Sequence, residues 1–228
     1  MFVKVKDLSF KYPNSKQNVL QKINFDVQQG DIVCILGKSG SGKSTVLRLI
    51  AGLEMPNSGT IEINNQIVVD DHNFILPENR EIGVVFQDYA LFPHMTVAEN
   101  ILFGIKNKNK DYQARKLQEV LELVDLTDSK EKYPHQLSGG QQQRIALARS
   151  LAIDPSLIVM DEPFSSLDAS LQSRIRGELE QIIKQTGITS IFVSHDKDDA
   201  ISIADKVIIL KDGKVIQQGK TDEIINNP

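Results

Sequence analysis

The sequence predicts an α/β fold with a mostly parallel core sheet, an N-terminal antiparallel β portion and an inserted helical subdomain. Two short apolar runs, at Ile32–Leu36 and 157–160, are typical of strands buried on both faces. Residues 3–10 and 19–27 alternate apolar and polar side chains, as half-buried strands do. Helical periodicity separates the two buried runs, so strands and helices alternate along the chain as in a parallel sheet.

The first third begins with two strands that a turn connects. Tyr12, Pro13, Asn14 and Ser15 have the composition of that turn. The buried run at 32–36 is followed by a glycine-rich loop, and then by residues with helical spacing, which are Val46, Leu47, Leu49, Ile50 and Leu53.

The middle third is helical, and we place an inserted helical subdomain at about 88–154 within a single domain spanning 1–228. Thr96 and Glu99 form a capping box that opens one helix. A second helix carries Leu117, Val120, Leu121 and Val124 on one face. In the last third, helices and strands alternate again. Two predicted strands, at 190–193 and 207–210, follow a helix whose apolar face carries Leu167, Leu171, Ile175, Leu179 and Ile183.

Composition limits the compartment and the partners. The formal net charge of −4, with both signs interspersed, argues against nucleic acid as a partner, because nucleic-acid binding usually needs a basic face. The single cysteine, Cys34, excludes an internal disulfide and fits a reducing compartment as a buried apolar side chain. No apolar stretch reaches the ~18 residues of a membrane span, and the N-terminus lacks the apolar core of a signal peptide. We therefore expect a cytoplasmic protein that reaches a membrane only through a partner.

The segment from 37 to 45 matches the phosphate-binding pattern G-x-x-x-x-G-K-[ST] between a strand and a helix. Its glycines let successive N–H groups point at one phosphate, and the helix N-terminus adds partial positive charge. We expect Lys43 to reach the β and γ phosphates of ATP and the Ser44 hydroxyl to bind Mg²⁺. The flanking strand favours a P-loop NTPase over a flexible Gly/Ser turn. The expected nucleotide-binding residues here are Gly37, Lys38, Ser39, Gly40, Ser41, Gly42, Lys43, Ser44 and Thr45.

Two acidic residues, Asp161 and Glu162, follow the buried run at 157–160. Ligands of open α/β sheets bind at the carboxyl ends of strands, where we expect this pair to lie. Asp161 can hold Mg²⁺ through water, and Glu162 can orient and polarise the attacking water. An ordinary strand followed by an acidic turn would have the same sequence pattern, so this motif indicates a catalytic site only in combination with the other motifs.

Leu137, Ser138, Gly139, Gly140 and Gln141, continued by residues 142–144, resemble the signature sequence of the ABC ATPase family. Ser138 and Gln141 also form a capping box for the next helix. Both interpretations can hold, because a glycine-rich helix start with free N–H groups is also an anion site. The resemblance extends from Tyr12 to about Gly219, with every family motif in order.

This resemblance implies roles for four further segments. Gln87 matches the glutamine that touches Mg²⁺ and the attacking water, and His195 resembles the switch histidine that contacts the γ-phosphate. Tyr12 either matches the aromatic residue on which adenine stacks or is an exposed turn residue. The segment of Ser165, Ser166, Leu167 and Asp168 either resembles the loop that meets a partner subunit or caps the following helix.

Within the family, residues 83–97 are especially similar to importer ATPases for ferric ion, polyamines, sulfate and maltose-type sugars. Those subunits often carry a further C-terminal β-rich regulatory domain, whereas this sequence stops at Pro228. The resemblance implies that two copies pack head to tail, with ATP between the phosphate loop of one copy and Ser138, Gly139 and Gly140 of the other.

The same resemblance implies integral membrane permease subunits as partners and, indirectly, an extracytoplasmic substrate-binding protein. Docking is expected near Gln87 and the apolar run at 90–95, which is otherwise a small core segment. The chain is then an ATPase that powers transport, most consistent with import, and is peripheral on the inner face of the membrane.

Two other function classes fit the sequence less well. DNA-acting members of the family carry a long coiled coil between the phosphate loop and the signature, and no sustained heptads lie there. Translation-factor members usually carry two such domains in one chain. A nucleotide sensor with little hydrolysis would not need both Glu162 and His195.

Overall fold

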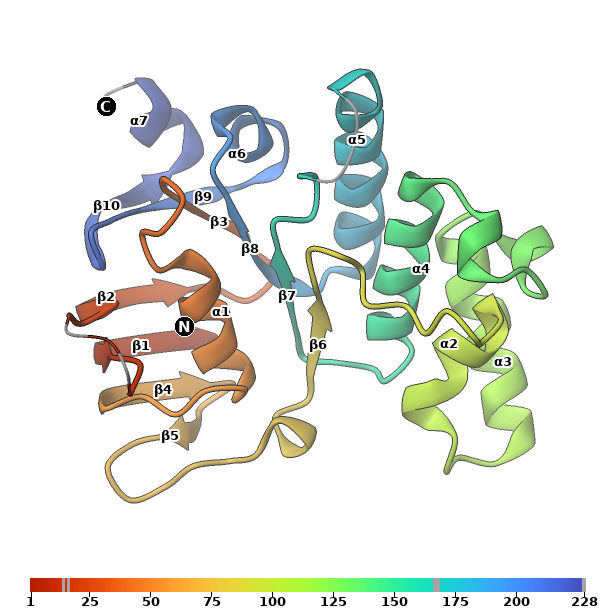
Figure 1. Ribbon diagram of the computed structural model, residues 1–228, viewed down its shortest axis with the longest axis horizontal. Coiled ribbons are helices and arrows are strands. Elements are labelled where there is room, and N and C mark those ends of the chain that lie inside the picture. Colours follow the sequence, from red (N-terminus) through yellow and green to blue (C-terminus); the bar gives the residue numbers. More distant parts are fainter. Residues whose placement is uncertain (14, 16, 166–168, 227–228) are drawn as a thin grey trace.

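A six-stranded sheet in the order β10-β9-β3-β8-β7-β6 forms the centre of the computed structural model, which describes residues 1–13, 15, 17–165 and 169–226 (Figure 1). Neighbouring strands from β9 to β6 pair in parallel, and β10 adds an antiparallel edge. The predicted mostly parallel core is therefore confirmed. The strands are Ile32–Leu36 (β3), Ile82–Val85 (β6), Leu157–Asp161 (β7), Thr189–Ser194 (β8), Lys206–Lys211 (β9) and Lys214–Lys220 (β10).

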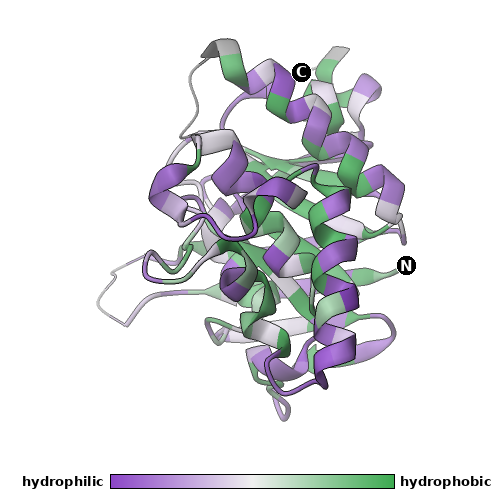
Figure 2. Cartoon of the chain, turned by 90° about the vertical axis from the view of Figure 1, so that its right-hand side faces the viewer, coloured by the Kyte–Doolittle hydropathy of each residue, from purple (hydrophilic) through white to green (hydrophobic). Residues whose placement is uncertain are grey.

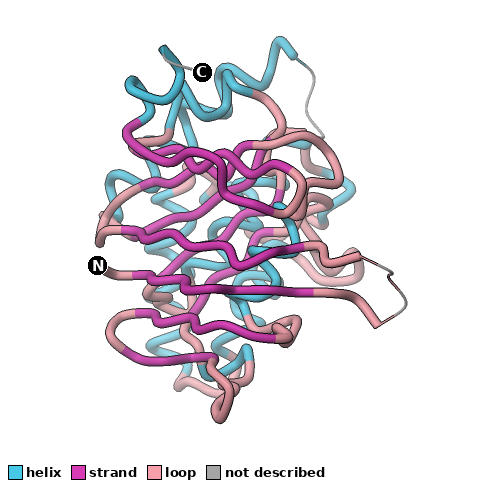
Figure 3. Tube along the Cα trace, turned by 90° about the vertical axis from the view of Figure 1, so that its left-hand side faces the viewer, coloured by secondary structure: helices cyan, strands magenta, loops and turns pink. Residues whose placement is uncertain are grey.

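A second sheet of four antiparallel strands, in the order β2-β1-β4-β5, lies beside the first (Figure 3). It confirms the predicted antiparallel N-terminal portion. The sequence analysis did not single out β4 and β5, although Asn64 and Asn65 between them have φ of 49° and 62°, as in a two-residue hairpin turn. The strands are Val3–Phe10 (β1), Leu20–Val27 (β2), Ser58–Ile63 (β4) and Gln66–Val69 (β5).

Helix α1 (Lys43–Ala51) packs between the two sheets. Its buried residues Val46, Leu49 and Ile50 share one core cluster with strands of the antiparallel sheet and with Val33 and Ile35 of β3. This packing fixes the helix, and with it the loop that precedes it, against the parallel sheet.

The opposite face of the parallel sheet is covered by α4 (Gly139–Leu151), α5 (Ala169–Thr186) and α6 (Lys197–Ile203). Ile32, Cys34 and Leu36 of β3 belong to this second cluster, because alternate side chains of a strand point to opposite faces. Figure 2 shows apolar residues on the enclosed strands and hydrophilic residues on the outer sides of the helices. Burial on both faces explains why β3 is continuously apolar.

Between β6 and β7 the chain forms α2 (Val97–Leu102), α3 (Lys110–Leu123) and α4, which lie together at the right of Figure 1. The predicted capping box opens α2: Thr96 Oγ1 accepts from Glu99 N–H at 3.2 Å, and Glu99 Oε2 accepts from Thr96 N–H at 2.7 Å. Asn100, which is fully buried, donates to the carbonyls of Phe92 and Met95 and so fixes the loop before α2.

The prediction that Leu53 lies on the first helix is wrong. Gly52, with φ of 78°, ends α1 in the left-handed conformation typical of helix C-termini, and Leu53 beyond it is 45% exposed. Leu167 of the predicted helical stripe lies outside the described residues.

In the described ranges, which also include the short α7 (Thr221–Asn226), no helix combines the length and apolar character needed to cross a membrane.

Burial gives one test of this packing. Cys34 is completely enclosed, and desolvation raises the pKa of its thiol well above its ordinary value. Because the thiolate is the reactive form, we expect the folded chain to resist thiol reagents at neutral pH, with labelling rising only as urea unfolds it. Labelling measured beside circular dichroism checks this, and rapid labelling of the fully folded chain would contradict the packing of β3.

Candidate nucleotide site

The phosphate loop connects β3 to α1 at the carboxyl edge of the parallel sheet (Figure 1). Gly37 N–H donates to the Ser194 carbonyl at 3.2 Å, which ties the start of the loop to the end of β8. Gly42 precedes α1 with φ of 102°, a conformation that a side chain would strain. No described side chain caps α1, so the N–H groups of its first turn are available to an anion.

Buried polar groups in this loop fit the phosphates of a nucleotide. Ser41 Oγ is buried and has no hydrogen-bond partner among the described residues. Lys43 is only 4% exposed, and its ammonium donates to the Lys38 carbonyl at 3.2 Å. Lys38, Ser39 and Gly40 are exposed at the mouth of the loop. An anionic ligand would satisfy the hydroxyl and offer the buried ammonium a stronger, charge-assisted partner.

The residues expected to hold Mg²⁺ include an adjoining hydroxyl and carboxylate. Ser44 Oγ donates to Asp161 Oδ1 at 2.7 Å. Burial raises the pKa of Asp161, and the hydrogen bond from Ser44 opposes that rise. Mg²⁺ usually takes one or two carboxylates together with substrate phosphates and water, and this pair of oxygen donors fits that preference. Among the described residues, no group of three His, Cys, Asp or Glu side chains could hold a metal ion by itself.

Gln87 lies just beyond β6, beside the segment that follows Glu162. Its Nε2 donates to Ser165 Oγ at 3.1 Å, and that hydroxyl donates to the Glu162 carbonyl at 2.9 Å. Ser165 therefore connects Gln87 to the backbone of Glu162, the candidate catalytic residue, while the contact of Gln87 with Mg²⁺ stays a prediction.

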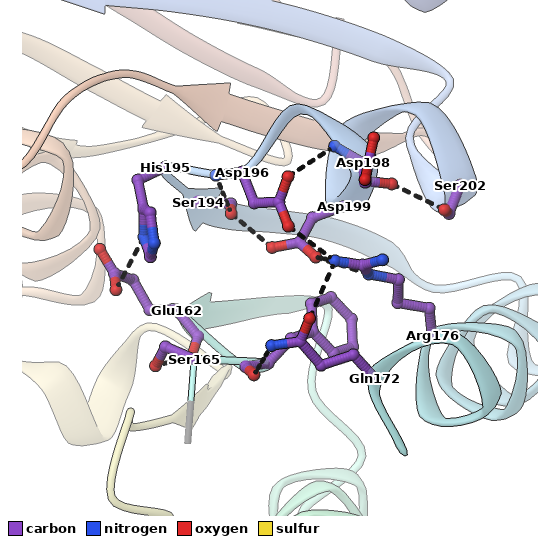
Figure 4. A network of polar contacts seen from close by, with 11 residues as sticks. Glu162, Ser165, Gln172, Arg176, Ser194, His195, Asp196, Asp198, Asp199 and Ser202 are labelled. Carbon is purple, nitrogen blue, oxygen red and sulfur yellow. Dashed lines mark hydrogen bonds and ion pairs between the residues drawn. The ribbon is translucent and has the colours of Figure 1, made fainter. Parts of the chain in front are cut away.

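Glu162 and His195 follow the ends of the neighbouring parallel strands β7 and β8. His195 Nδ1 lies 3.3 Å from Glu162 Oε2, and Lys43 Nζ lies 3.7 Å from Glu162 Oε1 (Figure 4 shows the first pair). Glu162 thus stands between the phosphate-loop lysine and the histidine. Its φ of 44° is a left-handed conformation, which costs about 1–3 kcal/mol for a residue with a side chain and is common at functional sites.

The signature residues lie apart from this cluster. Ser138 Oγ accepts from Gln141 N–H at 3.3 Å and Gln141 Oε1 accepts from Ser138 N–H at 2.9 Å, so the predicted capping box is confirmed. Gly139 opens α4, and Gly140 packs so closely on α5 that a Cβ would lie 2.5 Å from Ile175 Cδ1. Their pocket includes no residue of the phosphate loop, and α4 and α1 occupy different halves of Figure 1. Within one chain the two candidate anion-binding elements do not meet.

Tyr12 lies beside the first turn of α1. Its hydroxyl is 3.5 Å from Thr45 Oγ1, and its half-buried ring meets Phe10 edge-on with 4.7 Å between centroids. This position is compatible with the predicted stacking of adenine. Of the predicted partner loop at 165–168, the structure describes only Ser165, and residues 166–168 lie outside the described ranges.

A cavity of about 1190 Å³ lies elsewhere. It lies between α3 and the turn from α5 to β8, and includes none of the predicted site residues. The assignment of the nucleotide site therefore rests on the chemistry gathered at the sheet edge and not on cavity size.

The sequence analysis missed one cluster beside the site. Arg176, Ser194 and Asp199 form hydrogen bonds behind His195 and come from α5, β8 and α6 (Figure 4). They are separated along the chain and belong to no motif, so only the packing of α5 against α6 reveals them.

Comparison with known proteins supports the same interpretation. A sequence profile described as ABC transporter matches residues 20–165. The sulfate/thiosulfate import ATP-binding protein CysA 2 of Chromobacterium violaceum is 44% identical over 92% of this chain, and the Fe(3+) ions import ATP-binding protein FbpC of Haemophilus influenzae is 45% identical over 89%. This chain spans 56% and 58% of the lengths of those two relatives. A solved dimeric ATP-binding cassette, bound to ADP and Pi after hydrolysis, matches with a TM-score of 0.80 at 34% identity, over 96% of this chain and 98% of that one.

The buried lysine provides a test of the site. We expect Lys43→Ala to weaken ATP binding roughly ten- to over a hundred-fold, because a charge-assisted contact is typically worth ~1.5–3 kcal/mol. Calorimetric titration measures the change, with Lys214→Ala, an exposed lysine on β10, as a control that should bind normally. Wild-type affinity in Lys43→Ala would remove Lys43 from the site.

Proposed function

Since this chain belongs to the ABC transporter family, we propose that it is an ATP-hydrolysing subunit that powers substrate translocation by an importer through head-to-tail pairing of two copies. One observation carries the proposal: Glu162 lies 3.7 Å from Lys43 Nζ and 3.3 Å from His195 Nδ1. A carboxylate is thereby placed beside both the lysine expected at the γ-phosphate and the histidine expected to sense it, at the sheet edge where α/β proteins bind ligands.

The phosphate loop binds the nucleotide. The N–H groups at the start of α1 and the Ser41 hydroxyl bind phosphate oxygens, and Lys43 turns from the Lys38 carbonyl to the β and γ phosphates. Ser44 and Asp161, with Gln87, hold Mg²⁺, which neutralises charge on those phosphates when bound. The Tyr12 ring offers its face to adenine.

Glu162 acts on the attacking water. Its two oxygens face Lys43 and His195. When Lys43 moves to the phosphates, Oε1 loses its cationic partner and becomes free to accept a hydrogen bond from water. Oε2 stays beside His195, which keeps the carboxylate oriented while it accepts or positions the proton.

A second copy completes the site. The start of α4 offers N–H groups in a pocket that its own phosphate loop does not share, and the similar solved cassette is dimeric. Head-to-tail pairing brings Ser138, Gly139, Gly140 and Gln141 of one copy to the nucleotide of the other, and a two-fold axis produces two such sites. Loss of the γ-phosphate contacts on hydrolysis then opens the interface.

Permease subunits dock on an aromatic ledge made of Phe92 and Phe103. Their ring centroids are 4.6 Å apart, and Phe103 is 42% exposed. The Arg149 guanidinium lies over the Phe92 ring, 5.6 Å from its centroid, as in a cation–π contact. Leu91 and Met95 are half-buried, so the apolar run contributes both to local packing and to the exposed surface. Exposed apolar side chains grouped in this way are typical of a partner surface.

Import is supported by the two relatives, whose names specify sulfate/thiosulfate and Fe(3+) ions. The chain works at the inner face of the membrane without nucleic acid as a partner. Selection of the cargo falls to the permease subunits and an extracytoplasmic substrate-binding protein, because the ATPase touches nucleotide, its second copy and the permease but not the cargo. Residues 1–228 act as one ATPase domain, in which the subdomain at about 88–154 carries the signature and the docking ledge.

Replacing the carboxylate tests the proposed hydrolysis. An amide of the same shape can orient water but cannot take its proton, so Glu162→Gln should keep ATP affinity and lose about 10²–10⁴-fold in turnover. With hydrolysis blocked, the variant should accumulate as a dimer in Mg-ATP and stay monomeric without nucleotide. Turnover assays and size-exclusion chromatography measure both effects.

The two readouts separate the parts of the proposal. Wild-type turnover in Glu162→Gln would falsify its catalytic role. An inactive variant that stays monomeric with ATP would count against the composite site in the isolated subunit.

The docking ledge has its own test. Phe92→Ala should leave the isolated chain folded and able to bind ATP, while co-purification with its permease subunits should fall several-fold. Ile216→Ala, which removes a 59% exposed side chain from β10 at the other end of the sheet, should assemble normally. Unfolding of Phe92→Ala, or unchanged assembly, would assign Phe92 to local packing alone.

A further inference from the structure

The candidate switch histidine has little packing of its own. The His195 side chain is 52% exposed, and its Nδ1 contact with Glu162 is 3.3 Å long. The backbone on either side of an exposed imidazole sets the position and direction of its Cα–Cβ bond, and so sets which groups the ring can reach. The approach of His195 to Glu162 therefore depends on the anchoring of residues 194 and 196.

Both neighbours are anchored. Ser194 is 2% exposed; its Oγ donates to Asp199 Oδ2 and accepts from Asp196 N–H at 2.9 Å. Its carbonyl accepts from Gly37 N–H, the first residue of the phosphate loop. Asp196 caps α6 by accepting from Asp198 N–H at 2.9 Å. The turn that carries His195 is thus held at both ends by side-chain contacts.

One guanidinium, that of Arg176 on α5, connects these anchors (Figure 4). Arg176 Nε donates to Asp199 Oδ1 at 2.6 Å, and Nη2 donates to Asp196 Oδ2 at 2.9 Å. The residue is only 9% exposed. A planar guanidinium can hold two carboxylates at fixed directions, which a lysine ammonium on a flexible stem cannot do.

The same guanidinium also contacts the segment that follows Glu162. Arg176 Cζ lies 5.9 Å from the centroid of the Phe164 ring, two residues after Glu162. Arg176 Nη2 donates to Gln172 Oε1 at 3.4 Å, and Gln172 Nε2 donates to the Phe164 carbonyl at 3.1 Å. The Arg176 side chain therefore connects the segment that follows Glu162 to the turn that carries His195.

A buried ion pair of this kind is weak evidence of added stability, because desolvation of its charges offsets their attraction. Apolar side chains of similar volume would fill the space between α5 and α6 as well. The charged arrangement differs from an apolar one because each of its hydrogen bonds has a fixed direction.

We propose that Arg176, held by Asp199, is a positioning residue for ATP hydrolysis that fixes the turn of His195 relative to Glu162. The inference rests on the proposed function, since it assumes that Glu162 and His195 act on the nucleotide. Arg176 acts only through these two residues and lies outside the phosphate loop. Its loss should therefore affect the chemical step and leave nucleotide binding unchanged.

The first test compares Arg176→Lys and Arg176→Met with Lys184→Met, which removes a 57% exposed lysine from the same helix, away from the signature pocket. We expect kcat to fall about 10- to 100-fold in the Arg176 variants, because a misplacement of about 1 Å can cost 10²-fold. KM for ATP and ATP affinity should stay within about two-fold, and Lys184→Met should match wild type. Equal losses of ATP affinity and kcat, or the same loss in Lys184→Met, would overturn the proposal.

The second test observes the histidine directly and needs no turnover. The chain has four histidines, so His195→Ala assigns the His195 ring signal in a spectrum of ring-labelled protein. Arg176→Lys should shift or broaden that signal while Lys184→Met leaves it unchanged. An unaltered His195 signal in Arg176→Lys would overturn the positioning role. If Arg176→Met does not fold, Asp199→Asn takes its place, because it leaves Arg176 paired with Asp196.

A double variant separates this proposal from the function on which it rests. In a His195→Ala background, adding Arg176→Lys should lower kcat little further, because Arg176 acts through His195. Multiplicative losses would assign Arg176 a separate structural role. If instead Glu162→Gln and His195→Ala both hydrolyse ATP normally, the proposed function fails; if they are inactive and Arg176→Met is fully active, only the positioning role fails.

Discussion

The parallel pairing of β3, β7 and β8 is the constraint on which the rest of the structure depends. Register places Leu36 opposite Ser194 and Asp161 opposite Val193, so the phosphate loop, the acidic pair and His195 all leave the sheet at one edge. Burial on both faces fixes that register, because apolar side chains on each strand must meet α1 on one side and α4, α5 and α6 on the other. Strand pairing, rather than any loop, brings together residues that are over a hundred positions apart.

Several acidic and basic side chains lie close together at the carboxyl edge of the sheet. Lys43 and His195 both contact Glu162, Ser44 donates a hydrogen bond to the half-buried Asp161, and Arg176 pairs with Asp196 and Asp199. Burial raises the pKa of both Asp161 and Asp199, so each carboxylate depends on its partners to remain charged. We propose that a phosphate ligand draws Lys43 away and changes the surroundings of Glu162, so that ligand binding rearranges hydrogen bonds locally.

Much of the fold and part of the site follow from local sequence patterns. Apolar runs identified β3 and β7, and the capping boxes at Thr96 and Ser138 have the hydrogen bonds that their spacing predicted. Leu53 was assigned wrongly because helical spacing continues past Gly52, whose backbone ends the helix. Gly140 was attributed to anion binding alone, yet it also admits Ile175 of α5, a contact between distant segments. Arg176 escaped notice for the same reason: its partners come from another helix, and no periodicity within α5 indicates them.

We propose that two copies share each nucleotide between the phosphate loop of one and the signature of the other. The most direct measurement is an experimental structure of this chain with Mg²⁺ and a non-hydrolysable ATP analogue. We predict a two-fold dimer in which Lys43 of one copy and Ser138 and Gly139 of the other contact the same γ-phosphate, with Glu162 and His195 beside it. A nucleotide held by one copy alone, or bound away from the carboxyl edge of β3, would contradict it.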